Sequence, residues 1–152
     1  MKIDTTDSPR EEDEAFVVAQ TRAFNEAFTT NDVRPLCSFA RGPDGAIVGG
    51  LTAKTYWNYL DIAFLWVDES HRGAGIGQQL VQSAEAEAFR RGCRFALLDT
   101  FSFQARPFYE RLGYRQFGQL TGFPGGHVRH YMTKELGRPE LTLHAITSQT
   151  SR

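Results

Sequence analysis

The fold is decided by the stretch Val67-Asp68-Glu69-Ser70-His71-Arg72-Gly73-Ala74-Gly75-Ile76-Gly77-Gln78-Gln79-Leu80. It follows an apolar run, residues 59–67, which predicts a central strand, and it enters a run with apolar residues at helical spacing, which predicts a helix over residues 76–91. The alternate glycines after Arg72 let the backbone approach a ligand closely, and the unpaired amides of a first helical turn attract anions. We therefore expect an anion-binding loop here, with a tight strand-to-helix turn as the alternative interpretation.

The rest of the chain divides into further strand and helix patterns. We expect a short first strand near residues 2–5, helices over residues 12–28 and 104–112, and strands over residues 36–41, 46–56, 95–100, 114–120 and 128–136. This order predicts an α/β fold with a mixed, mostly antiparallel sheet of six to seven strands, flanked by about three to four helices and containing one parallel crossover. We expect a single domain over residues 1–136 and a polar tail over residues 137–152.

Composition narrows the classes of partner. The 152 residues carry a formal net charge of −1, so no excess of positive charge favours nucleic acid or an anionic membrane. No apolar run approaches the roughly 20 residues that span a bilayer, and the polar start lacks a secretion signal, so we expect a cytoplasmic protein. Exposed strand edges allow a homodimer.

The two cysteines, Cys37 and Cys93, are too few for a disulfide framework or a four-ligand zinc site, and we expect both to be buried thiols. His127 and His130 do not form a metal pair, because an odd spacing on a strand sends them to opposite faces. We expect no metal.

Two motifs now carry a resemblance to a known family. Arg72, Gly75 and Gly77 match the pattern Arg/Gln-x-x-Gly-x-Gly/Ala, and residues 105–114 (Ala-Arg-Pro-Phe-Tyr-Glu-Arg-Leu-Gly-Tyr) match Ala-x-x-x-Tyr-x-x-x-Gly-Phe/Tyr. In this order the two motifs resemble the signatures of the GNAT superfamily of N-acetyltransferases. The resemblance covers nearly all of residues 2–136 and implies acetyl-CoA as the co-substrate.

The resemblance also implies which residues hold acetyl-CoA. In the family, the backbone of the central strand binds the pantetheine arm, and here that segment is Leu65, Trp66 and Val67. The pyrophosphate would be bound by Arg72 and by backbone amides of the loop and first helical turn. These amides belong to Gly73, Ala74, Gly75, Ile76, Gly77 and Gln78. Many members carry Asn where this chain has Ser102, whose hydroxyl can still form a hydrogen bond to the cofactor.

Tyr109 matches the family tyrosine that commonly protonates the departing thiolate. The attacking amine must lose a proton, and three candidates remain open for that step. Asp61, the acidic residue of the apolar strand, matches the base glutamate of histone-acetylating members in its offset from Val67; the alternative is a buried carboxylate bonded to backbone or to a neighbouring strand. His127 is a rival base with a pKa near neutral, and a water chain is the third. His127 and Phe123 lie in the connection that we expect to face the substrate.

These residues predict acetyl transfer from acetyl-CoA to a primary amine, expected on a small molecule, by direct attack in a ternary complex. The alternatives are acetylation of a protein lysine or N-terminus, and a CoA-binding sensor without turnover.

Overall fold

The computed structural model describes residues 1–137, which divide into two compact units, the first spanning Met1–Asp32 and the second beginning at Val33. The first unit contains helix α1 (Glu11–Asn25), whose first turn holds four acidic residues, where the helix dipole favours them. The prediction of a strand at residues 2–5 is wrong: this segment is exposed, has no regular secondary structure and pairs with no strand among residues 1–137. So short a segment forms a strand only when a neighbouring strand supplies its backbone hydrogen bonds. Without one, its backbone groups bond to water instead. The predicted tail lies outside the described residues, apart from Gly137.

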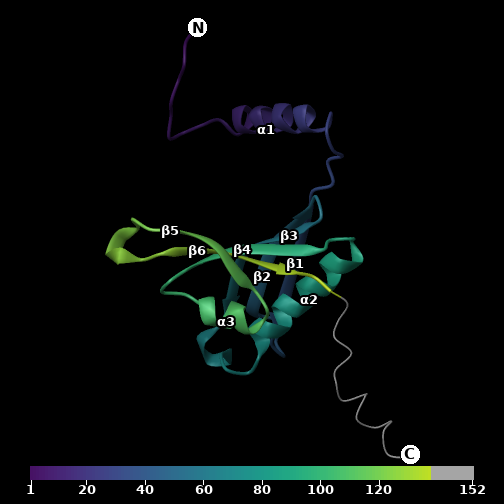
Figure 1. The fold of residues 1–152 in the computed structure, drawn as a ribbon, viewed down its shortest axis with the longest axis vertical. Coiled ribbons are helices and arrows are strands. Elements are labelled where there is room, and N and C mark those ends of the chain that lie inside the picture. Colours follow the sequence, from purple (N-terminus) through teal and green to yellow (C-terminus); the bar gives the residue numbers. More distant parts are fainter. Residues whose placement is uncertain (138–152) are drawn as a thin grey trace, which may run out of the picture. The chain divides into compact units, whose positions relative to one another are not determined.

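The second unit is built on a six-stranded sheet with the order β1-β2-β3-β4-β6-β5 (Figure 1). Its strands are β1 (Arg34–Arg41), β2 (Ile47–Tyr56), β3 (Tyr59–Val67), β4 (Phe95–Phe101), β5 (Arg115–Leu120) and β6 (Arg129–Glu135). All neighbouring strands are antiparallel except β3 and β4, which are parallel and joined through a helix. The predicted mixed, mostly antiparallel α/β fold is confirmed, with six strands and three α-helices among the described residues.

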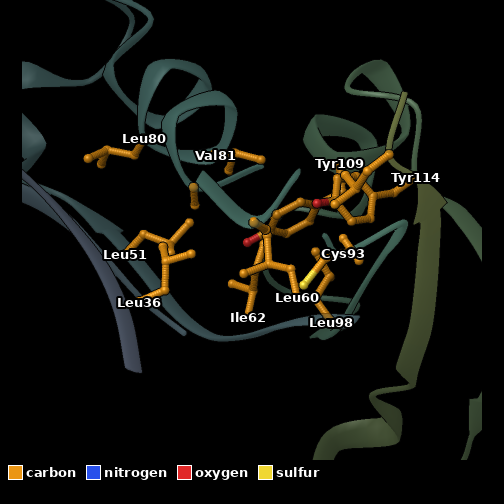
Figure 2. Close-up of a cluster of buried hydrophobic side chains, with 14 of the residues drawn as sticks. Leu36, Leu51, Leu60, Ile62, Leu80, Val81, Cys93, Leu98, Tyr109 and Tyr114 are labelled. Atoms are coloured by element: carbon orange, nitrogen blue, oxygen red, sulfur yellow. The ribbon is translucent and has the colours of Figure 1, made fainter. Parts of the chain in front are cut away.

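Helices α2 (Ile76–Arg90) and α3 (Arg106–Arg111) pack on the same face of the sheet (Figure 1). Helix α2 buries Leu80, Val81, Ala84 and Ala88, which follow the three- and four-residue spacing of one helical face. Figure 2 shows Leu80 and Val81 facing strand leucines, with Tyr109 of α3 beside Tyr114. The two helices and the sheet therefore share one apolar core.

Strands β3 and β4 separate part-way along their length. Their registered pairs are Tyr59 with Phe95, Leu60 with Ala96, and Asp61 with Leu97. Beyond these pairs β3 continues to Val67 and β4 to Phe101, while β3 stays paired with β2 as far as Gly49 opposite Val67. Ala63 of β3 has no registered partner, because Ile62 pairs with Ala53 and Phe64 with Thr52. This bulge in β3 lies two residues beyond the last β3–β4 pair, and bulges increase the local twist of a strand. The sheet therefore opens between its two central strands.

The cysteines have different environments. Cys93 is buried, as expected, but Cys37 is exposed, so the prediction for Cys37 is wrong. Its neighbour Leu36 occupies the buried face of β1, and because side chains alternate along a strand, Cys37 points the other way.

Candidate active site

A cleft of about 780 Å³ lies where β3 and β4 separate. It is lined by the end of β3, by the loop and first turn that follow, and by α3 with the segment before it. Nine of the predicted cofactor-binding residues lie along it: Leu65, Trp66, Val67, Arg72, Gly73, Gly75, Ile76, Gly77 and Gln78. Ala74 and Ser102, also predicted to bind the cofactor, are not part of its lining.

The glycine loop leaves its backbone open to the cleft. Gly73 and Gly75 have φ angles of +83° and +79°, a left-handed conformation that side chains rarely adopt, and no atom lies within 4 Å of a Cβ built on either. Gly75 caps α2 without a side-chain hydrogen bond, and the first turn of α2 contains no acidic residue. The first amides of α2 therefore have no competing carboxylate, which fits an anion such as a pyrophosphate.

Gly77 is needed for a different reason. A Cβ at this position would lie 3.3 Å from Cζ of Phe108 on α3 and 3.8 Å from Cγ2 of Val67. The start of α2, the end of β3 and α3 meet closely here, so the absence of a side chain at Gly77 allows this close approach.

Arg72 and Asp68 fix the loop between β3 and α2. The Nε of Arg72 donates to the carbonyl oxygen of Val67 at 3.1 Å, which brings its guanidinium back to the end of β3. Asp68 accepts hydrogen bonds from the Ser70 amide and hydroxyl and contacts Nδ1 of His71 at 3.2 Å. These bonds, first Ser70 and then His71, lower the pKa of Asp68. The loop is thus held from both of its ends.

The structure adds lining residues that were not predicted to bind the cofactor: His71, Phe103, Gln104, Ala105, Phe108, Arg111 and Leu112. Arg111 supplies a second cation to the cleft beside Arg72. Phe108, Arg111 and Leu112 are spaced three and four residues apart, so they share one face of a helix, and this spacing was the available signal.

Tyr109 lies within the core and is not part of the cleft lining, although its neighbour Phe108 is. It is 8% exposed and packs its ring against Phe108, with ring centroids 5.1 Å apart, and against Tyr114, at 5.9 Å. Burial, and secondarily the negative charge of Asp99, raises the pKa of Tyr109 to about 12. The phenol therefore keeps its proton at neutral pH, as a general acid must.

Asp61 lies at the last registered pair before the strands separate, opposite Leu97 on one side and Lys54 on the other. The hydroxyl of Tyr56 donates to its Oδ2 at 3.4 Å. Asp61 is half-buried and does not line the cleft. The side chain that donates to it, Tyr56, belongs to β2.

His127 and Phe123 gather with two phenylalanines into an aromatic cluster, defined here as Phe101, Phe103, Phe123 and His127. Phe101 stacks on Phe103 at 5.3 Å and meets Phe123 edge-on at 4.9 Å, while Phe103 meets His127 edge-on at 4.7 Å. The cluster joins the end of β4 to the β5–β6 connection.

Ser102 links the end of β4 to the aromatic cluster through hydrogen bonds. Its hydroxyl oxygen accepts a hydrogen bond from the Val128 amide at 3.1 Å and lies 3.1 Å from Nδ1 of His127. The hydroxyl that was expected to contact the cofactor is therefore engaged with the β5–β6 connection in this structure.

Among residues 1–137, no three His, Cys, Asp or Glu side chains come together as a metal-binding group. In the same part of the chain, every helix is too short or too polar to cross a bilayer.

Comparison with known proteins now identifies the family. Residues 4–114 match the model of the acetyltransferase (GNAT) family. The chain belongs to this family. The GNAT match spans the strand, glycine loop and α2 as well as the motif around Tyr109, and it makes the protein an N-acetyltransferase.

Individual relatives agree with the GNAT assignment. The chain is 39% identical to a blasticidin-S acetyltransferase from Streptomyces morookaense over 109 residues, covering 69% of this chain and 80% of the relative. The crystal structure of an acetyltransferase from Agrobacterium tumefaciens superposes with a TM-score of 0.84 at 33% identity. The match covers 89% of this chain and 99% of that one. The crystal structure of an acetyltransferase from Bacillus cereus superposes with a TM-score of 0.77 at 34% identity. The match covers 88% of this chain and 98% of that one.

Proposed function

We propose that this GNAT protein transfers the acetyl group of acetyl-CoA to the primary amine of a small molecule, by direct attack in a ternary complex. The observation that carries the proposal is the cleft at the strand separation, which is lined by the glycine loop and by Phe108, whose ring packs against Tyr109. The name of the Streptomyces relative, which acetylates blasticidin-S, supports a small-molecule acceptor.

The loop and the two cleft arginines would bind acetyl-CoA. The amides at the start of α2 and the cations of Arg72 and Arg111 suit a pyrophosphate, since charge-assisted hydrogen bonds are the strongest that a protein offers. The free backbone edge of β3, from Leu65 to Val67, suits an extended amide-containing arm. Neither feature needs a positive net charge on the whole protein.

Acetyl-CoA supplies an activated acetyl thioester, and the chain's own residues would manage the protons. The amine nitrogen attacks the carbonyl carbon, an amide bond forms and the carbon–sulfur bond breaks. Tyr109 gives its proton to the departing thiolate, and the proton that the amine releases then restores the Tyr109 phenol. The products are the acetylated amine and the CoA thiol. Asp61, His127 or a water chain would receive the amine proton on its way.

The proposal is tested by following thiol release from acetyl-CoA with a panel of small amines. We expect release with at least one amine, and a Tyr109→Phe rate that is lower by about 100-fold, since general acids contribute factors of this size. Tyr114→Phe is the matched control: this tyrosine is buried beside Tyr109, and its hydroxyl has no hydrogen-bond partner. Removing that hydroxyl should leave the rate nearly unchanged.

The pH profile gives a second readout. Because the pKa of Tyr109 is raised to about 12, its phenol stays protonated and the rate should not fall on the alkaline side up to about pH 11. CoA binding without thiol release for any amine would contradict the proposal and favour a sensor. Acetylation of peptide amines alone would move the acceptor to the protein class.

A further inference from the structure

Asp99 is an acidic residue in the active-site region that the sequence analysis did not single out. It lies on β4, two residues beyond Leu97, the last β4 residue paired with β3. Side chains alternate along a strand, so Asp99 shares the sheet face of Leu97, whereas Leu98 and Thr100 are buried on the face of α2 and α3. Asp99 therefore stands at the opening between the strands, where the paired neighbour on β3 is missing.

The charge of Asp99 reaches the Tyr109 phenol, although burial is the larger cause of the raised pKa of Tyr109. Tyr109 belongs to the core on the helix side of the sheet, yet the negative charge of Asp99 contributes to the raised pKa of its phenol. An amine between these two groups would have an anion on one side and the proton donor of the leaving thiolate on the other.

Arg129 of β6 holds Asp99 in place. Its Nε donates to Oδ2 of Asp99 at 2.7 Å, and its guanidinium lies 5.7 Å from the ring centre of Phe101 and 5.3 Å from that of Tyr131. No hydrogen bond within residues 1–137 reaches Oδ1 of Asp99, and the side chain is 32% exposed. One carboxylate oxygen is thus fixed, and the other is available to a ligand.

Asp61 is less suited to the same task. It lies at the closed end of the opening and accepts a hydrogen bond from Tyr56, and Lys54 is registered opposite it on β2. Both carboxylates already accept a hydrogen bond, Asp61 from Tyr56 and Asp99 from Arg129. Asp99 differs because it lies beyond the last β3–β4 pair and on the exposed face of β4, where a ligand can reach its second oxygen.

We propose that Asp99 binds the ammonium group of the acceptor through its free oxygen, so that this enzyme selects cationic amines without a carboxylate next to the amine. The inference rests on the proposed function. Arg129 acts as a positioning residue for Asp99, and Phe101, at the edge of the aromatic cluster, provides an apolar wall for the remainder of the acceptor. An acceptor with an α-carboxylate would bring a second negative charge to Asp99 and be rejected.

Tyramine and tyrosine make the sharpest pair of probes, because they share a ring and an amine and differ in the carboxylate. Histamine and putrescine extend the cationic set. Thiol release should favour tyramine over tyrosine by at least about 10-fold in kcat/KM, and calorimetry in the presence of CoA should show the same order of affinity. Equal use of tyrosine and tyramine would overturn the inference.

Asp99→Asn tests the residue itself. We expect it to raise the KM for the best cationic amine at least about 10-fold and to weaken its binding equally, with CoA affinity unchanged. Asp99→Glu, which restores the charge, should recover part of the affinity. Glu135→Gln is the matched control: this exposed carboxylate lies on β6 opposite Phe95, at the far end of the β4–β6 pair from Arg129, and its removal should change the KM for the amine less than about twofold. Thermal unfolding of each variant shows whether it is folded.

The outcomes separate this inference from the proposed function. Wild-type protein that turns over amines while Asp99→Asn keeps the same KM overturns the role of Asp99 alone. Wild-type protein that binds tyramine in an Asp99-dependent way without turnover contradicts the catalytic proposal and supports the binding site. Failure of the wild type to bind tyramine, histamine and putrescine overturns the inference.

Discussion

The two halves of strand β3 have the same apolar character but different surroundings. The first half, up to Asp61, is registered with β2 on one side and β4 on the other, and Leu60 is fully buried. The second half is registered only with β2, and Leu65 and Val67 are partly exposed along the cleft. One strand thus stabilises the sheet with its first half and leaves backbone available for a ligand with its second. The edge of β3 that lacks a partner strand is where we propose that acetyl-CoA binds.

The largest effect on stability should come from the paired half. Leu60→Ala removes a side chain with 0% exposure and should lower the free energy of unfolding by about 4 kcal/mol, through lost burial and the cavity left behind. Leu65→Ala in the open half is the matched control and should cost about half as much, because Leu65 is only partly buried. Urea denaturation measures both. Equal losses would remove the energetic distinction between the two halves.

The next largest effect should concern ligand binding at the open half. Arg72→Glu replaces a cation of the cleft by an anion and releases the bond to the Val67 carbonyl, so CoA affinity should fall about 100-fold, or roughly 2.7 kcal/mol. Arg90→Glu, an exposed charge reversal in the last turn of α2, should leave CoA affinity within about threefold. Calorimetric titration with CoA compares the two. Unchanged binding by Arg72→Glu would sink the assignment of the loop as the anion site.

The smallest effect should come from the loop backbone. Gly75→Ala forces a side chain into a φ of +79° and should destabilise the protein by about 1 kcal/mol, with weaker CoA binding if the loop relaxes. Gly118→Ala places a Cβ in open space at a glycine without positive φ and should change stability by less than about 0.5 kcal/mol. Thermal unfolding with and without CoA resolves the two. A loss of stability equal to that of Gly118→Ala would show that strain at Gly75 is not what requires the glycine.

Local patterns made much of this protein predictable. The alternate glycines, the anion-ready start of α2 and the tyrosine motif lie within short stretches, and the geometry that they require depends on their own φ angles and helical spacing. The strand at residues 2–5 and the buried state of Cys37 were mispredicted for the opposite reason. Pairing and burial depend on which strand or face lies opposite, and a short segment does not contain that information.

The sequence by itself determined the family, the fold class and the residues of the glycine loop, since these depend on short-range chemistry that survives any particular packing. Only the tertiary structure decided where β3 leaves β4, that Arg111 reaches the cleft, and that Asp99 stands near Tyr109 with Arg129 holding it. Asp99 and Arg129 are 30 residues apart and meet because β4 and β6 pair in one register. Contacts of this range are set by the sheet as a whole, because one step of register would turn each side chain to the other face.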